Sequence, residues 1–361
     1  MFPKKLDVYI IKKFMFTFFI AILLIIGIVI IFDISEKIDD FVSRQAPIKA
    51  IIFDYYVNFI PYFMNMFSPL FVFITVIFFT SRMAANTEII GILSCGISFH
   101  RMMLPYIFSA TIIALLSLGL NLFVIPRSNV QRHKFEAVYT KKKNQASERN
   151  IHYQIAPGQF VYVEQFSKYN NTAYKFTLES IKDNKLVSKL SAERAVWDST
   201  FGGWTLKKYF IREYNDGLED KVKCGDQLDT VISLTVTDMT RKKNTVEDLP
   251  YKELDELTKT QKQRGDPNVK YSLIEKHQRF SLPFSAFILT IMGVALSSRK
   301  KRGGIGWNLA IGIALSFSYI LFMRFSQMFV YTGVMPPWLA IWLPNIIFAV
   351  IAGVLYKIAP K

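Results

Sequence analysis

The side chains that most often perform chemistry are few in this chain and lie far apart in the sequence. It contains no Gly-x-x-x-x-Gly-Lys-Ser/Thr loop that would bind nucleotide phosphates, and no nucleophile elbow accompanies its serines. The histidines lack the short spacing of metal ligands, which favours ordinary surface or interfacial roles for His100, His133, His152 and His277. An enzyme is unsupported by these residues, and no cofactor or metal is expected.

Long apolar segments form the larger part of the scaffold that must position these side chains. Of its 361 residues, 51% are hydrophobic, and six continuous apolar segments of about 18 to 27 residues can each cross a hydrocarbon layer of about 30 Å as a helix. The segments are Phe14–Phe32, Phe53–Phe79, Met102–Ile125, Phe280–Ser297, Trp307–Tyr331 and Trp338–Tyr356. The sequence therefore predicts a polytopic α-helical membrane protein with six transmembrane helices.

Two charged residues, Asp54 and Arg324, lie inside these segments, and they lie on different ones. Arg324 precedes Tyr331 by seven positions, so its Cα lies about 10 Å below the outer end of the fifth segment. One interpretation is that its guanidinium reaches the outer headgroups or satisfies buried carbonyls. The other is that it faces a cavity and attracts phosphate or an acidic sugar.

Basic residues gather on one side of the predicted membrane. They face only Asp7 and Glu88 there, whereas the loop after the first segment is nearly neutral, and this asymmetry follows the positive-inside rule. The basic residues are Lys4, Lys5, Lys12, Lys13, Arg82, Arg101, Arg299, Lys300, Lys301, Arg302, Lys357 and Lys361. Both termini are expected in the cytoplasm, and the long insert between the third and fourth segments is expected outside.

Most of the net charge of +16 therefore comes from the basic residues that orient the protein in the membrane. The excess on the insert has no aromatic-interleaved basic motif, so an anionic lipid or polysaccharide is a more natural partner than nucleic acid. Cys95 and Cys224 are expected on opposite sides of the membrane, where they cannot pair with each other.

The insert has the pattern of a β domain. Tyr174, Phe176 and Leu178 alternate with polar residues at period two. Turn signals occur at Asp183-Asn184, Gly202-Gly203 and Asp216-Gly217. Further strand-like runs are Tyr153–Ala156, Gln159–Phe166, Leu186–Trp197, Trp204–Tyr214 and Val231–Val236. A meander that curls or stacks into a sandwich or open barrel is the simplest arrangement.

After the β domain, residues Thr245–Arg264 have the pattern of an amphipathic helix that Gly265-Asp266-Pro267 would end. The predicted division is 1–126 (transmembrane helices 1–3, with a cytoplasmic helix at about 82–95), 127–245 (β domain), 246–270 (helical connector) and 271–361 (transmembrane helices 4–6).

The loop after the second segment carries the most specific local signal. Ile89, Ile90 and Leu93 recur at helical spacing, and Gly96 is a natural helix stop. One interpretation is a loop that lies on the membrane surface. The other is a docking helix for a cytoplasmic partner, with Glu88 available to meet a basic groove.

Several motifs, in this order, resemble the LptF/LptG family of lipopolysaccharide-export permeases along essentially the whole chain. The resemblance rests on Leu6-Asp7-Val8-Tyr9-Ile10, Thr87-Glu88-Ile89-Ile90 with Gly96-Ile97-Ser98, Val124-Ile125-Pro126, Phe160-Val161-Tyr162-Val163-Glu164 and Arg279-Phe280-Ser281-Leu282-Pro283. It implies a jellyroll-like β domain between helices 3 and 4. It also implies a place in the bacterial inner membrane.

The resemblance further implies partners and sites. Family members pair as a heterodimer, bind a cytoplasmic ATPase dimer, hold lipopolysaccharide between the two halves and pass it to a periplasmic bridge protein. Glu88 would be the acidic residue of the coupling helix, with Ile89, Ile90 and Leu93 beside it. The family's basic residues at the outer end of the first helix have only Lys37 and Arg44 as candidates here, and solvated loop charges are an equal alternative.

We therefore expect a non-catalytic permease subunit of an ATP-driven lipopolysaccharide exporter, with ATP hydrolysis on a separate chain. One alternative is an integral-membrane enzyme that acts on envelope lipid or glycan, which would need paired polar residues at one membrane depth. A permease for lipoprotein release is disfavoured, because such families place the outer domain after the first span.

Overall fold

A computed structural model describes residues 5–140, 148–167, 169–214, 221–232, 234–236, 239, 246–266, 268–298 and 304–359. The chain divides into two compact units. The membrane unit comprises Met1–Lys141, Glu247–Tyr251 and Leu273–Lys361, and the β unit comprises Lys142–Val246 and Lys252–Ser272. The basic residues Lys4, Arg299–Arg302 and Lys361, and the predicted turn at Asp216-Gly217, lie outside the described residues.

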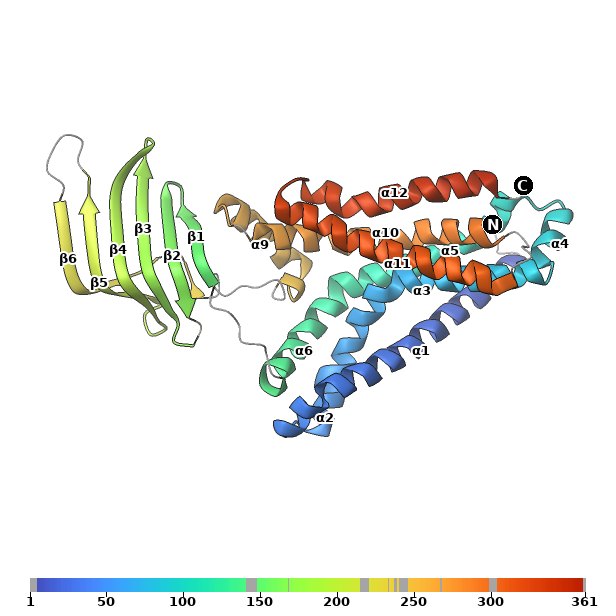
Figure 1. The fold of residues 1–361 in the computed structure, drawn as a ribbon, viewed down its shortest axis with the longest axis horizontal. Helices are drawn as coiled ribbons and strands as arrows, with labels where there is room; N and C mark the ends of the chain where they lie inside the picture. Colours follow the sequence, from blue (N-terminus) through green and yellow to red (C-terminus); the bar gives the residue numbers. More distant parts are fainter. Residues whose placement is uncertain are drawn as a thin grey trace. The chain divides into compact units, whose positions relative to one another are not determined.

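Within the described residues, six helices are long and apolar enough to cross a membrane, as predicted (Figure 1). The first, fourth, fifth and sixth are α1 (Lys5–Ser43), α10 (Val269–Ser297), α11 (Gly304–Thr332) and α12 (Pro337–Ile358). The second runs through α2 (Ile48–Ala50), π-helical η1 (Ile51–Tyr56) and α3 (Val57–Ala85). The third runs through α5 (Phe99–Gly119), π-helical η2 (Leu120–Val124) and α6 (Ile125–Tyr139).

The first helices continue well beyond the apolar segments that predicted them. α1 has 39 residues, or about 58 Å at 1.5 Å per residue, so it extends past a hydrocarbon layer. The predicted boundary at residue 126 falls inside the third helix, and the two compact units part at residues 141 and 142 instead. Pro126 does not stop this helix, because it lies just after the π-helical turn η2, where the regular hydrogen-bond ladder is already interrupted.

Small and polar residues bring the helices of the membrane unit together. A Cβ added at Gly312 of α11 would collide with the Ile77 side chain of α3, so glycine permits the close approach of these two helices. Asn308 Nδ2 donates to Ser81 Oγ at 3.0 Å, and Tyr319 Oη donates to Asn345 Oδ1 at 2.8 Å. Such bonds join α11 to α3 and α12 inside an apolar solvent that offers no alternative partners.

The β unit contains a six-stranded antiparallel sheet whose strands follow chain order (Figure 1). This arrangement is the predicted meander. Asp183 and Asn184 both have positive φ, as a two-residue hairpin between the third and fourth strands requires. The strands are β1 (Glu148–Ala156), β2 (Gln159–Ser167), β3 (Thr172–Lys182), β4 (Lys185–Asp198), β5 (Gly203–Glu213) and β6 (Lys221–Thr230).

The predicted strand at Val231–Val236 is wrong. The strand that follows β5 in the sheet is β6. β6 is an edge strand with one neighbour among the described residues, and edge strands are often polar, so hydrophobicity did not reveal it in the sequence. Ile232 and Leu234 instead bury their side chains in the core without pairing. The Leu234 carbonyl accepts a 2.7 Å hydrogen bond from Trp204 Nε1, which fixes this segment over the sheet.

The predicted helix at Thr245–Arg264 is shorter in the structure, where α9 spans Tyr251–Gln263. Pro250 accounts for the later start, because the residue before a proline is disfavoured in helical conformation. The predicted end is confirmed, since Gly265 has a φ of +61° that suits glycine.

Candidate functional site

A seven-residue helix, α4 (Glu88–Ser94), carries all four residues of the predicted coupling site. The predicted helix at about 82–95 is therefore two elements, because Arg82–Ala85 belong to α3. The chain reverses at Asn86-Thr87, where Thr87 adopts a left-handed φ of 62°. Gly96, with a φ of 78°, ends the helix as predicted.

The side chains of α4 have different environments. Ile89 is 1% exposed and packs into the core of the membrane unit, with Leu93 partly buried against the same cluster. Ile90 is 51% exposed. Ile89 therefore anchors α4 to the unit, and Ile90 is the apolar side chain that α4 presents outward.

Glu88 is half-buried and is tied to two neighbours. Tyr9 Oη of α1 donates to Glu88 Oε2 at 3.2 Å, and Asn86 Nδ2 donates to Glu88 Oε1 at 3.2 Å. Lys13 Nζ in turn donates to Tyr9 Oη at 2.6 Å. One oxygen of the carboxylate is thus held by α1 and the other by the turn that precedes α4.

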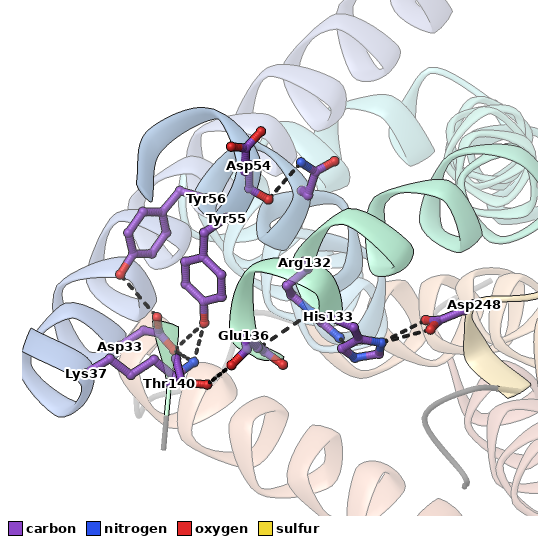
Figure 2. A network of polar contacts seen from close by, with 11 residues as sticks. Asp33, Lys37, Asp54, Tyr55, Tyr56, Arg132, His133, Glu136, Thr140 and Asp248 are labelled. Atoms are coloured by element: carbon purple, nitrogen blue, oxygen red, sulfur yellow. Dashed lines mark hydrogen bonds and ion pairs between the residues drawn. The ribbon is translucent and has the colours of Figure 1, made fainter. Parts of the chain in front are cut away.

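Lys37 lies in a polar network at the far end of α1, and Figure 2 shows two tyrosines pointing toward the same carboxylate. Lys37 Nζ is 2.8 Å from Asp33 Oδ1 and also donates to Tyr55 Oη. Tyr55 Oη and Tyr56 Oη donate to Asp33 at 3.2 and 3.1 Å. Lys37 is consequently paired with Asp33, and its side chain is 23% exposed.

The other two predicted substrate residues are exposed and lie on different elements. Arg44 follows α1, and its Nη1 donates to the Val138 carbonyl of α6 at 2.8 Å. Arg324 lies on α11, and its Nη2 is 3.5 Å from Met66 Sδ of α3. No hydrogen bond or ion pair joins Lys37, Arg44 and Arg324 to one another in the part of the chain that the structure describes.

Sequence reasoning missed two buried arginines in the membrane unit. Arg132 of α6 is 7% exposed and lies 4.6 Å from the centre of the Tyr62 ring. Its neighbour His133 places Nδ1 2.9 Å from Asp248 Oδ1 (Figure 2). Arg132 lies in the polar stretch that continues the third apolar segment as a helix, and this stretch was outside the predicted span.

Arg279 of α10 is the second, at 2% exposure, with its Nε 2.8 Å from Glu275 Oε1. Among the described residues, its Nη1 and Nη2 have no hydrogen-bond partner. Arg279 belongs to the motif Arg279-Phe280-Ser281-Leu282-Pro283, but the motif does not indicate whether its side chain is buried. Within the described ranges, no three His, Cys, Asp or Glu side chains are grouped so that they could hold a metal ion.

Comparison with protein-family models gives a match over residues 8–358, to the family described as lipopolysaccharide export system permease LptF/LptG. The chain belongs to the LptF/LptG family. The match covers nearly the whole chain, so it includes both the membrane unit and the β unit. A comparison with curated protein sequences gives no match. The LptF/LptG family is a transport permease family, and the six candidate spans among the described residues agree with a place in the inner membrane.

Proposed function

We propose that this permease is one half of an ATP-driven exporter that extracts lipopolysaccharide from the inner membrane and passes it to a periplasmic bridge protein. The observation that carries the proposal is the family match over residues 8–358, which includes the transmembrane helices and the inserted sheet together. A soluble module held between the third and fourth spans suits a route from the bilayer to the periplasm. The second half would be another subunit of the same family.

The energy source belongs to a separate cytoplasmic ATPase dimer, because the chain has no phosphate-binding loop of its own. The contacts of α4 support a docking role. Ile90 and the accessible part of Glu88 face outward, while Ile89 holds the helix to the unit and Tyr9 links it to α1. ATP-driven movement of α4 would therefore reach α1 directly.

Substrate contacts are proposed for exposed cations rather than for Lys37. Arg324 retains an exposed guanidinium on α11, where a fixed bidentate cation suits a phosphate or acidic sugar. Arg44 is exposed as well, although one of its donors is used by Val138.

Isolation of the native complex tests the function. The tagged full chain is purified from membranes, its subunits and bound lipid are identified by mass spectrometry, and ATP-dependent release of lipopolysaccharide is measured. We expect an ATPase, a second family member and lipopolysaccharide. A complex that contains neither the ATPase nor lipopolysaccharide would overturn the proposal.

A further inference from the structure

A groove of about 710 Å³ runs between α1 and α5 in the membrane unit, beginning where both helices begin. Its walls are largely apolar, and its polar residues are Asp7, Lys12, Arg101 and Thr111. Leu104 and Phe108 are 48% and 56% exposed, so they form an open lipid-facing side.

The end of the groove at the start of the helices carries a net positive charge. Arg101 binds Asp7 through two bonds, with Nη1 to Oδ1 at 2.7 Å and Nη2 to Oδ2 at 2.6 Å. This pair is neutral as a whole. Lys12 is exposed and forms no hydrogen bond or ion pair with any residue in the described ranges, so its charge is available to a ligand.

The apolar length of the groove fits one leaflet of a bilayer. From Arg101 to Thr111 the α5 backbone rises about 15 Å, which is about half of a hydrocarbon layer of 30 Å. A cation at one end and an apolar wall of this length match a phospholipid, which has a phosphate at one end and acyl chains that span one leaflet. The groove volume of about 710 Å³ also lies in the range of small-ligand sites, roughly 300–1,000 Å³, and is small for a glycolipid with several acyl chains.

We propose that the α1–α5 groove binds one anionic glycerophospholipid, with its phosphate against Lys12 and an acyl chain along Leu104 and Phe108. The lipid is held as part of the permease and is not exported. It joins the first turns of α1 to α5, and α1 is the helix that Tyr9 connects to Glu88 on α4. Bound lipid therefore stabilises the position from which α4 acts.

Photocrosslinking in defined bilayers tests the site. The full chain, with any subunits it retains, is placed in nanodiscs of phosphatidylcholine that contain trace phosphatidylglycerol or phosphatidylcholine bearing a diazirine in the acyl chain. Labelled peptides are identified by mass spectrometry. One lysine near the headgroup attracts an anionic lipid by about 1 kcal/mol, which corresponds to about fivefold enrichment. We therefore expect phosphatidylglycerol to label the peptide with Leu104 and Phe108 about fivefold more than phosphatidylcholine does.

The matched variants are Lys12→Gln and Lys357→Gln. Lys357 is an exposed lysine at the end of α12, near the start of α5, and does not line the groove. Lys12→Gln should bring the labelling ratio close to one at unchanged yield and gel-filtration profile, and Lys357→Gln should keep the wild-type ratio. Soluble glycerol phosphate should not compete, because it lacks the acyl chain.

Equal labelling by the two lipids in the wild-type chain, or an unchanged ratio in Lys12→Gln, would show ordinary surrounding lipid and overturn the proposal. Full competition by glycerol phosphate would also overturn it, since the site would then be one for free anions. The assay needs neither ATP nor lipopolysaccharide, so its failure leaves the proposed export function untouched.

Discussion

Glu88 and Ile89 are adjacent in the chain, yet their side chains serve different purposes. Glu88 is held by Tyr9 and Asn86 and keeps part of its carboxylate accessible, whereas Ile89 is enclosed in the core. Substitutions at these neighbouring positions should therefore separate docking from stability.

The first prediction concerns the charge of Glu88. Truncating one partner of a buried interfacial charge pair costs about 2–5 kcal/mol, so Glu88→Ala should raise the Kd for the ATPase at least about tenfold. Glu88→Asp should do less harm because it keeps the charge. Binding is measured by titrating the purified ATPase against the permease complex, with Ser94→Ala on the same helix as the control. Wild-type affinity and export in Glu88→Ala would leave Glu88 as a surface charge.

The second prediction compares the two isoleucines of α4. Ile89→Ala should lower the free energy of unfolding by about 2–5 kcal/mol, because it opens a cavity in the core. Ile90→Ala should leave stability within about 0.5 kcal/mol and weaken ATPase binding. Detergent titration of the purified chain measures the first effect and the ATPase titration measures the second. Equal loss of stability in both variants would contradict the assigned orientation of α4.

At the scale of elements, the network around Asp33 joins α1 to the π-helical segment η1. One carboxylate accepts hydrogen bonds from Lys37, Tyr55 and Tyr56, and the surrounding rings of Phe41, Tyr55, Tyr56, Phe59 and Phe135 form an aromatic cluster. Because its charges are largely shielded from solvent, this contact should be more strongly coupled than a surface pair.

The third prediction is a double-mutant cycle on this contact. Asp33→Ala alone leaves the Lys37 ammonium without its carboxylate, so the single variant should lose more stability than the double variant with Lys37→Ala. We expect a coupling energy of about 1–3 kcal/mol. Asp255 and Lys259 on α9 have the same four-residue spacing, but Lys259 is 70% exposed, so their coupling should stay below about 1 kcal/mol. Equal coupling in the two cycles would mean that burial adds nothing at Asp33.

At the scale of the whole molecule, the two cysteines report the orientation of the permease. Both are exposed, with Cys224 on β6 in the β unit and Cys95 at the end of α4 in the membrane unit. From the distribution of lysine and arginine, we expect Cys224 in the periplasm and Cys95 in the cytoplasm.

The fourth prediction follows from this orientation. A membrane-impermeant thiol reagent admitted through the outer membrane should label Cys95→Ser, which retains Cys224. It should label Cys224→Ser only after the inner membrane is opened. Labelling is measured by a mass shift on the gel, with the variant that lacks both cysteines as the blank. The reverse pattern would overturn both the orientation and the direction of transport.

The order of the short motifs indicated the family, while hydropathy, charge asymmetry and period-two alternation in the sequence predicted six spans and the inserted β domain. Spans and strands of this kind form wherever a segment meets lipid or water on one face, so the hydrophobicity of each segment by itself predicts them. Tertiary structure alone decided that Ile89 turns inward and that Tyr55 and Tyr56 bond Asp33, because both contacts join helices distant in the chain. The pairing of Asp33 with Lys37 was readable from their four-residue spacing. The structure also showed that β6, and not Val231–Val236, forms the strand beside β5, because an edge strand is defined by its hydrogen-bonded pairing and not by its hydrophobicity.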